Sequence, residues 1–366
     1  MLAVRCVLLF FAALMPCSLA LFHKQIATDA TRQSSACFTL NMIGFGPRSP
    51  RVGVRTKEPL PEEQVPVAAG ELPDDAFSQY PPLSTQQLAT LKRAEDIDLG
   101  HGETIPAEVV NRIKEKHGFK LFDEKLFPGI RLLHADPVVF EVDNFFTPEE
   151  CDAYISMSTE KLPKGRKGSL KSMEIRSATT SSESQFQQQR TSTTWFHHYV
   201  CAPELVAKAS ALLGVEDISL WEEPQTVRYR PGEKFSWHLD ALPPSETGAS
   251  KGGQRTATVL VYLTNLQGNA GGATAFRDLG PLRVRPKKGK CLVFFPSFGG
   301  EPGSPFDTRT LHAGEVVGKG KKAREKYIAQ LWCHKKSYPA AVPEGNSHEA
   351  AEEVIADYTR RWREQS

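Results

Sequence analysis

Short hydrophobic segments with the composition of β-strands recur from the middle of the chain to its end. Residues 256–263, 290–295 and 327–332 are rich in β-branched and aromatic side chains, and glycine, proline or charged residues bound them. Residues 138–142 alternate strongly and weakly apolar side chains, which also predicts a strand. The pattern predicts a mainly β fold with flanking helices, although periodicity alone does not distinguish one β-sandwich from another.

Helical signals accompany these strands. Thr147 and Pro148, followed by two glutamates, supply an N-cap, a proline for the first turn and acids for the positive end of a helix. Residues 84–95 begin with a capping serine and have helical apolar spacing. Residues 347–362 place acids early and arginines late, so we predict a C-terminal helix that covers the core or a partner.

The first twenty residues have the pattern of a signal peptide. Arg5 precedes a short apolar run, and the small residues Ser18 and Ala20 suit a cleavage site. The run is shorter than the roughly 20 apolar residues that usually span a membrane. We expect cleavage near Ala20 and residence in the endoplasmic reticulum or Golgi lumen. An uncleaved N-terminal anchor is the alternative, and contact with a membrane is expected only in that case.

The rest of the chain divides by composition. We expect residues 21–83 to be a disordered targeting and linker region, because they begin poor in acids and end rich in proline and acids. An acid-poor segment behind a signal peptide would also suit delivery to a complex plastid. We assign residues 84–135 to a small helical accessory region, 136–336 to a catalytic unit of ordinary domain size, and 337–366 to a tail with a helix.

Charge and cysteine content give little further information on function or on disulfide pairing. The formal net charge of +2 gives no global signature of nucleic-acid binding, so no nucleic-acid partner is expected. Seven cysteines do not define a disulfide framework in 366 residues. If Cys6 and Cys17 leave with the signal peptide, five remain, and one or two bridges could form among them. The oligomeric state is not readable from the sequence.

The most informative chemistry lies in residues 229–240, which end in His238-Leu-Asp240. In a strand, residues two positions apart project from the same face, so His238 and Asp240 could share one cation. His312 follows much later in the chain and supplies a second imidazole. Two histidines and one carboxylate, with open coordination positions, form the facial triad of non-haem Fe(II) oxygenases. Zinc on the same three ligands remains the alternative, although no cysteine pair supports a structural zinc site.

The segments around these residues resemble one known family. They read Tyr-Arg-Pro-Gly-Glu-Lys-Phe-Ser-Trp-His-Leu-Asp at 229–240, Gly-Gly-Gln-Arg at 252–255, Gly-Gly-Ala-Thr-Ala-Phe at 271–276, and Lys-Tyr-Ile-Ala-Gln-Leu-Trp at 326–332. In order and spacing they resemble the prolyl 4-hydroxylase family of 2-oxoglutarate- and Fe(II)-dependent dioxygenases, over about residues 136–336. The resemblance implies a double-stranded β-helix (jelly roll) core, Fe(II), 2-oxoglutarate as co-substrate, and ascorbate.

The resemblance also assigns the co-substrate residues. Lys326 stands where the family places the lysine that holds the distal carboxylate of 2-oxoglutarate. Lys321 and Lys322 are less suitable, because they lie among glycines in a predicted turn. Tyr229 and Thr274 occupy positions that commonly donate hydroxyls to a co-substrate carboxylate. A packed tyrosine and an ordinary strand threonine are the alternatives for these two residues.

Substrate contacts are implied at three positions. Arg190 begins a segment that resembles the family's Arg-Thr-Ser element, and Arg255 follows a Gly-Gly-Gln turn, although either could be a surface arginine. Phe235 stands where the peptide hydroxylases usually have tyrosine, and Thr193 and Thr194 replace a usual glycine. The preceding residues 164–190 are polar, and we expect a mobile loop there, either a substrate lid or simply disordered.

The predicted reaction is hydroxylation of peptidyl proline coupled to conversion of 2-oxoglutarate and oxygen to succinate and carbon dioxide. The partner is then a proline-containing peptide or protein. Because Phe235 and the Arg190 segment depart from the family pattern, a lysyl residue or a free amino acid is the alternative substrate. A catalytically silent oxygenase fold used for binding is a further alternative, which the intact metal ligands oppose.

Overall fold

The computed structural model divides the chain into two compact units, residues 1–63 and 64–366, and every described residue belongs to the second unit. The structure describes residues 80–97, 105–120, 126–159, 191–268, 270–280, 282–298, 306–318, 324–339 and 348–365, together with the backbone of 172–176. The predicted signal peptide, most of the predicted linker, Arg190, Lys321 and Lys322 lie outside these residues. Among the described helices, none is long and apolar enough to cross a membrane.

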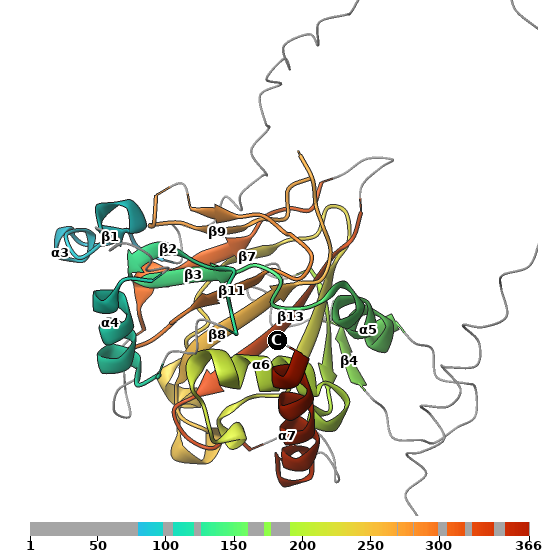
Figure 1. Cartoon of the computed structure of the whole chain (residues 1–366). Helices are drawn as coiled ribbons and strands as arrows, with labels where there is room; N and C mark the ends of the chain where they lie inside the picture. The colour runs from blue at the N-terminus through green and yellow to red at the C-terminus, as the bar shows by residue number, and fades with distance from the viewer. Residues whose placement is uncertain are drawn as a thin grey trace, which may run out of the picture. The chain divides into compact units, whose positions relative to one another are not determined.

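Two antiparallel sheets form the centre of the described unit (Figure 1). The larger sheet has the strand order β1 (Lys92–Arg93), β2 (Ile130–Asp136), β3 (Val138–Val142), β11 (Cys291–Phe294), β8 (Arg255–Tyr262), β13 (Lys326–His334), β6 (Gln225–Tyr229), β5 (Thr193–His197) and β4 (Ser172–Arg176). The smaller sheet has the order β10 (Arg283–Val284), β9 (Thr274–Phe276), β12 (His312–Gly314) and β7 (Phe235–His238).

The connection of these strands defines the fold. From β6 onward the chain passes from the larger sheet to β7 in the smaller one, back to β8, out to β9 and β10, back to β11, out to β12 and back to β13. The two sheets face each other, because Val227 and Leu260 of the larger sheet share one buried cluster with Phe276 and Val284 of the smaller sheet. The predicted double-stranded β-helix is therefore confirmed.

The central strands of the larger sheet are buried on both faces. Leu260 and Tyr262 contribute to the cluster between the sheets, whereas Val259 and Val261 belong to the cluster on the opposite face, as the two-residue period of a strand requires. The helices α4 (Ala107–His117), α5 (Pro148–Thr159), α6 (Pro203–Leu213) and α7 (His348–Gln365) contribute to this second cluster. Short 3-10 turns complete the described unit: η2 (Ala94–Asp96), η3 (Tyr199–Cys201), η4 (Ile218–Leu220), η5 (Pro244–Glu246), η6 (Ala249–Lys251) and η7 (Thr308–Thr310).

The helix starts follow the predicted local chemistry. At the start of α5, the Glu150 amide donates to the Thr147 hydroxyl at 3.2 Å, and the Thr147 amide donates to the Glu150 carboxylate at 2.8 Å. This reciprocal pair is a capping box. The predicted C-terminal helix is confirmed as α7, which packs on α6 through the buried residues Ala351 and Ile355.

The predicted helix over 84–95 is wrong beyond its first turn. Ser84 and Gln87 form a capping box, but α3 (Thr85–Leu88) ends after four residues. The chain then enters β1, where Lys92 and Arg93 pair with β2. Sheet pairing therefore overrides the local helical propensity.

The region preceding residue 136 is joined closely to the rest of the unit. The predicted boundary at residue 136 falls at the turn between β2 and β3, which are hydrogen-bonded neighbours. Ile113 of α4 and Leu132 of β2 lie in the same core cluster as the central strands. Residues 105–120 and 126–135 thus contribute to the sheet and core of the catalytic unit.

The structure tests part of two further predictions, the loop at 164–190 and the disulfide bridges. Residues 172–176, inside the predicted loop 164–190, form β4 paired with β5, so a continuous loop is wrong there; the rest of that segment lies outside the described residues. The four cysteines of the described residues are free thiols, so no bridge joins any two of them: Cys151, Cys201, Cys291 and Cys333.

Candidate metal centre

The smaller sheet brings the three predicted metal ligands together. His238 ends β7, His312 begins β12, and the two residues are direct partners in the register of these strands. Asp240 follows two residues after His238 and is buried. One ligand atom from each of the three residues lies within 4.8 Å of the others. Residues 74 positions apart in the chain are thus placed around one point by strand pairing.

Backbone carbonyl groups orient both imidazole rings. The Nδ1 atom of His238 lies 2.8 Å from the Ser236 carbonyl oxygen, and that of His312 lies 3.0 Å from the Thr310 carbonyl oxygen. An Nδ1–H group that donates to a carbonyl leaves the Nε2 lone pair for a metal. The two Nε2 atoms lie 3.6 and 3.8 Å from the Asp240 carboxylate oxygens, so all three donors face one another.

The Asp240 carboxylate is held in its ionised form. Burial opposes its ionisation, but His312, His238 and Arg255, together with a hydrogen bond from Thr258, lower its pKa below the ordinary value. The Thr258 hydroxyl donates to Asp240 Oδ2 at 2.7 Å. Two neutral imidazoles and one carboxylate form a donor set that fits Fe(II) with open coordination positions.

Aromatic rings surround the ligands and limit access of water. The Phe235 ring stacks on His238 with centroids 3.6 Å apart. Phe294 meets His312 edge-on at 4.7 Å, and Phe276 lies 5.7 Å from the same ring. The predicted substrate residue Phe235 is therefore in direct contact with a metal ligand.

Lys326 lies at the start of β13 with its ammonium group in a buried pocket. Lys326 is 2% exposed, and among the described residues no carboxylate forms an ion pair with it. The ammonium lies 4.9 Å from the ring centroid of Tyr229 and 5.7 Å from that of Tyr262. Burial lowers the pKa of Lys326 to about 7, partly offset by attraction to Glu315. A buried cation without a partner fits an anionic ligand.

Glycine keeps the space beside this lysine open. Gly272 has φ +74°, and a Cβ atom there would lie 2.7 Å from Leu266 Cδ1 and 3.4 Å from Lys326 Cδ. Any larger residue would therefore be strained and would press on the lysine stem. The close approach explains why a glycine pair precedes β9.

The two predicted hydroxyl donors lie near Lys326. Tyr229 on β6 is its direct partner across the strand pair. Thr274 on β9 is buried and accepts a hydrogen bond from the Tyr262 hydroxyl at 2.8 Å, while the Tyr262 ring lies beside the lysine. Tyr229 therefore borders Lys326 directly, and Thr274 is linked to it through Tyr262.

Arg255 has defined partners rather than a free surface position. Its Nε lies 2.5 Å and one terminal nitrogen 3.0 Å from the two carboxylate oxygens of Glu222. Its guanidinium lies 3.7 Å from the centroid of Trp332 and contacts the backbone oxygen of Asp240 at 3.4 Å. His334 also contacts Glu222, at 2.6 Å. Arg255 therefore joins a buried polar network beside the metal ligands.

Several functional groups were not predicted from the sequence. Thr258, Tyr262 and Glu222 each contact a predicted site residue, and His334 contacts Glu222. Thr258 gave no distinctive signal, because Thr256 is a second polar residue on the same face of β8. The pairing of Glu222 with Arg255 depends on residues 33 positions apart, and no local pattern indicates it.

Two buried N–H groups on the inner face of the larger sheet lack acceptors. Among the described residues, no hydrogen-bond partner reaches Gln225 Nε2 or Trp332 Nε1. Trp332 is the strand partner of Thr258, which itself contacts Asp240. Buried polar groups are usually hydrogen-bonded, so unpaired ones beside a metal centre fit a ligand rich in acceptors.

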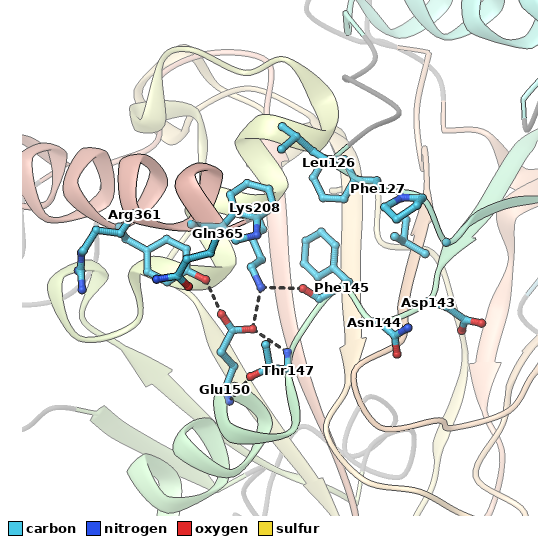
Figure 2. A pocket seen from close by; sticks show the side chains of 15 residues that line it. Leu126, Phe127, Asp143, Asn144, Phe145, Thr147, Glu150, Lys208, Arg361 and Gln365 are labelled. Atoms are coloured by element: carbon cyan, nitrogen blue, oxygen red, sulfur yellow. Dashed lines mark hydrogen bonds and ion pairs between the residues drawn. The ribbon is translucent and has the colours of Figure 1, made fainter. Parts of the chain in front are cut away.

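A cavity of about 480 Å³ is lined by residues of α5, α6, α7 and the segment after β3, and its buried lysine is paired. Figure 2 shows Lys208 pointing toward Glu150 and the Phe145 carbonyl, with distances of 2.7 and 2.9 Å. The Tyr358 hydroxyl of α7 donates to the same glutamate. The charge of the buried Lys208 is already neutralised by Glu150, which also binds Tyr358 of α7. This cavity is therefore a structural junction that fixes α7.

Comparison with known proteins agrees with the metal centre. Residues 224–334 match the model of the 2OG-Fe(II) oxygenase superfamily. A probable prolyl 4-hydroxylase 4 from Arabidopsis thaliana is 30% identical over 247 residues, which cover 59% of this chain and 74% of that protein. A prolyl 4-hydroxylase 2 from the same plant is 28% identical over 262 residues, 64% and 78% of the two chains. The viral collagen prolyl hydroxylase of Paramecium Bursaria Chlorella virus-1, solved as a 2OG complex, is 24% identical with a TM-score of 0.39, covering 53% and 94%.

The donor set and these matches define the class of the protein as a 2-oxoglutarate-dependent dioxygenase that uses Fe(II). The chain belongs to the prolyl 4-hydroxylase family within the 2OG-Fe(II) oxygenase superfamily.

Proposed function

We propose that this dioxygenase hydroxylates proline in a peptide or protein chain. The observation that carries the proposal is the pair of buried donors without acceptors, Gln225 Nε2 and Trp332 Nε1, on the two strands that also carry Tyr229 and Lys326. The relatives at 28–30% identity are named prolyl 4-hydroxylases, which supports the same substrate.

An extended peptide suits the arrangement of these donors. Trp332 lies six residues after Lys326 on β13, so both project from the same face of the strand. Gln225 lies on the neighbouring strand β6, in phase with Tyr229. Carbonyl oxygens of an extended chain recur along the backbone and would supply acceptors at such intervals. We assign to Arg255 the role of fixing this surface, because Glu222 and Trp332 hold its guanidinium.

The side chains of the site would perform positioning rather than proton transfer. His238, Asp240 and His312 would hold Fe(II), and Lys326, with the hydroxyls of Tyr229 and Thr274, would bind 2-oxoglutarate. When bound, the iron and co-substrate supply the conversion of oxygen, 2-oxoglutarate and a C–H bond to succinate, carbon dioxide and an alcohol. The protein's part is to order the reactants and exclude water. We propose ascorbate as the reductant that keeps the iron ferrous.

Phe235 favours an alternative to peptidyl proline as the substrate. Phe235 contacts His238 but has no hydroxyl to offer a substrate. A lysyl residue or a free amino acid would then be bound by other groups of the same site. Phe235→Tyr should change the KM for a proline peptide by about fivefold if the peptide passes this ring, since one hydrogen bond is worth roughly 1 kcal/mol.

We propose that the enzyme acts in the secretory pathway, in the endoplasmic reticulum or Golgi lumen. The support is the signal-peptide pattern of residues 1–20. Delivery to a complex plastid, or retention by an uncleaved anchor, is the alternative. Fluorescence microscopy of the full chain with a C-terminal tag distinguishes these destinations.

The test of the function is turnover with defined peptides. Purified protein, Fe(II), ascorbate and 2-oxoglutarate should form succinate faster when a proline-rich peptide is present, and the peptide should gain one oxygen atom on proline. A peptide with every proline replaced by alanine is the matched control. Succinate formation that no proline peptide stimulates, with a stimulating lysyl peptide or amino acid, would replace the proposed substrate.

A further inference from the structure

Tyr80 packs behind the metal-binding face of the smaller sheet. It adjoins a buried cluster that has Leu239 at its edge and consists of Trp237, Ala275, Leu311 and Ala313. Four of these residues are sequence neighbours of a metal ligand, because 237 and 239 adjoin His238 and 311 and 313 adjoin His312. Side chains alternate between the two faces of a strand, so the cluster lies on the face opposite to the two imidazoles. The segment of residues 80–90, which includes α3, therefore begins directly behind the metal centre.

Arg277, directly after β9, holds the start of this segment by its backbone. The arginine side chain is 6% exposed, and its guanidinium donates to the Tyr80 carbonyl at 2.6 Å and to the Pro81 carbonyl at 3.0 Å. The Arg277 amide donates to the Leu311 carbonyl at 3.0 Å, next to His312. The start of the segment is thus fixed to the residue that precedes a metal ligand.

Two side chains of the segment contact η7, the turn that ends two residues before His312. The Gln87 side-chain amide donates to the Thr308 hydroxyl at 2.8 Å. The Thr90 hydroxyl accepts a hydrogen bond from the Arg309 guanidinium, also at 2.8 Å. Residues 80–90 lie outside residues 224–334, which match the family model, so these contacts join a segment beyond the matched part to the turn of a metal ligand.

Arg309 connects these contacts to the backbone of the turn. Its side chain is 6% exposed, and its guanidinium lies 2.7 and 2.6 Å from the two carboxylate oxygens of Asp307 and 3.0 Å from the carboxylate of Asp136. Asp307 is the N-cap of η7, and its carbonyl accepts a hydrogen bond from the Thr310 hydroxyl at 2.7 Å. The Thr310 carbonyl oxygen lies 3.0 Å from Nδ1 of His312. Arg309 thereby fixes the turn whose carbonyl orients a ligand.

We propose that residues 80–90 are a positioning segment for the metal ligand His312, and that Arg309 is the residue through which they act. The segment holds η7 in place, and Arg309 keeps the Thr310 carbonyl where it orients the imidazole. A ligand held in this way is ordered before the metal binds, which favours binding. This role concerns the metal alone and is the same whichever substrate the enzyme hydroxylates.

The double variant Thr90→Val/Thr308→Val tests this role. It removes both hydroxyl groups that join the segment to η7 and keeps the shape of both side chains. In the full chain, Mn(II) affinity measured by electron paramagnetic resonance should fall about fivefold, the effect of one ordinary hydrogen bond. This is less than the 10- to 100-fold loss usual for a direct partner of a ligand. A less ordered His312 should also change the visible absorption bands of the Co(II)-loaded protein.

Thr90→Ser/Thr308→Ser is the matched control, because it keeps both hydroxyl groups. It should bind Mn(II) as the unaltered protein does and leave the Co(II) bands in place. Urea denaturation of the metal-free proteins measures stability separately. A valine variant that loses stability but binds Mn(II) with unchanged affinity would show a purely structural segment and overturn the proposal. An equal loss of affinity in the serine variant would overturn it as well.

Gln87→Met provides a second variant in case the valine variant does not fold. It breaks the contact with Thr308 from the side of the segment and leaves every residue of η7 in place. Mn(II) affinity should fall about twofold, half of the free-energy change expected for the double variant. Ser84→Ala is its control, because it breaks the capping box with Gln87 but not the contact with Thr308. Unchanged affinity in Gln87→Met, or an equal loss in Ser84→Ala, would contradict the assigned role.

Discussion

Two buried lysines of this chain have opposite surroundings. Lys208 of α6 contacts the Glu150 carboxylate at 2.7 Å and the Phe145 carbonyl at 2.9 Å, and it lies 5.5 Å from the Trp362 ring (Figure 2). Lys326 of β13 is equally buried, but among the described residues it has no ion-pair partner. The first lysine joins α6 to α5, whereas the ammonium of the second lies near the rings of Tyr229 and Tyr262.

The contrast shows how pairing separates structure from function. A buried charge costs several kcal/mol unless partners compensate it, so a lysine placed without a partner has been retained for another reason. Two buried donors without acceptors, Gln225 Nε2 and Trp332 Nε1, lie on the same two strands as Tyr229 and Lys326.

The largest effect is expected at the metal centre. Asp240→Ala removes the carboxylate ligand, so succinate formation should fall by at least about 100-fold, more than the loss usual for an outer contact. Thermal unfolding of the metal-free protein should change little. Asp152→Ala is the matched control, since Asp152 is exposed and paired only with Lys288. Full turnover in Asp240→Ala would remove this residue from the metal site.

The two lysines should differ next in their effect on stability. Lys208→Met leaves Glu150 without its buried cation and should lower the free energy of unfolding by about 3 kcal/mol. Lys326→Met removes a buried charge that has no partner, so the free energy of unfolding should stay the same or rise. Urea denaturation of the metal-free proteins measures both. Equal losses in the two variants would break the comparison.

An outer contact of the metal centre should have a smaller effect. Thr258→Val removes the hydroxyl that donates to Asp240 at 2.7 Å, and metal affinity should fall by roughly 10- to 100-fold. Thr256→Val is the control on the same face of β8, because Thr256 donates to the Cys333 carbonyl instead. Titration with Mn(II) followed by electron paramagnetic resonance gives both affinities. Equal affinities in the two variants would show that Thr258 does not support the ligand.

The smallest expected effect is the contribution of Lys326 to the pH dependence of stability. The pKa of Lys326 is about 7 in the folded protein and 10.5 in the ordinary, unfolded environment. Between these values the unfolded state binds more protons, so this lysine makes the free energy of unfolding rise with pH, by at most about 1.4 kcal/mol per unit. Below pH 7 the lysine is charged in both states and the gain is absent. Lys326→Met should remove the rise, as urea denaturation at several pH values would show.

Much of the metal centre could be predicted from the sequence, because its ligands sit in a short local pattern. His238 ends β7 and Asp240 lies two residues beyond it, so the short spacing brings the two ligands together although Asp240 lies after the strand. The α5 start was equally readable, since its capping box lies within four residues. The His238–Asp240 pair and the start of α5 could be predicted because each depends on residues that lie close together in the sequence.

Features that depend on distant residues could not be predicted in this way. The helix predicted for residues 84–95 was too long, because Lys92 and Arg93 pair with β2 and form a strand there. The Glu222–Arg255 and Glu315–Arg283 pairs each join residues at least 32 positions apart, so no window of sequence contains both partners. Arg190 and the N-terminal targeting predictions lie outside the described residues and stay predictions.

Calorimetric titration of 2-oxoglutarate into the Mn(II)-loaded enzyme tests the central claim most directly. If the unpaired lysine is the binding group, Lys326→Met should weaken binding by about 10- to 100-fold, the value of a hydrogen bond to a charged group. Lys208→Met, compared at a temperature where it is folded, should bind as the unaltered enzyme does. Unchanged affinity in Lys326→Met, or an equal loss in both variants, would contradict the account.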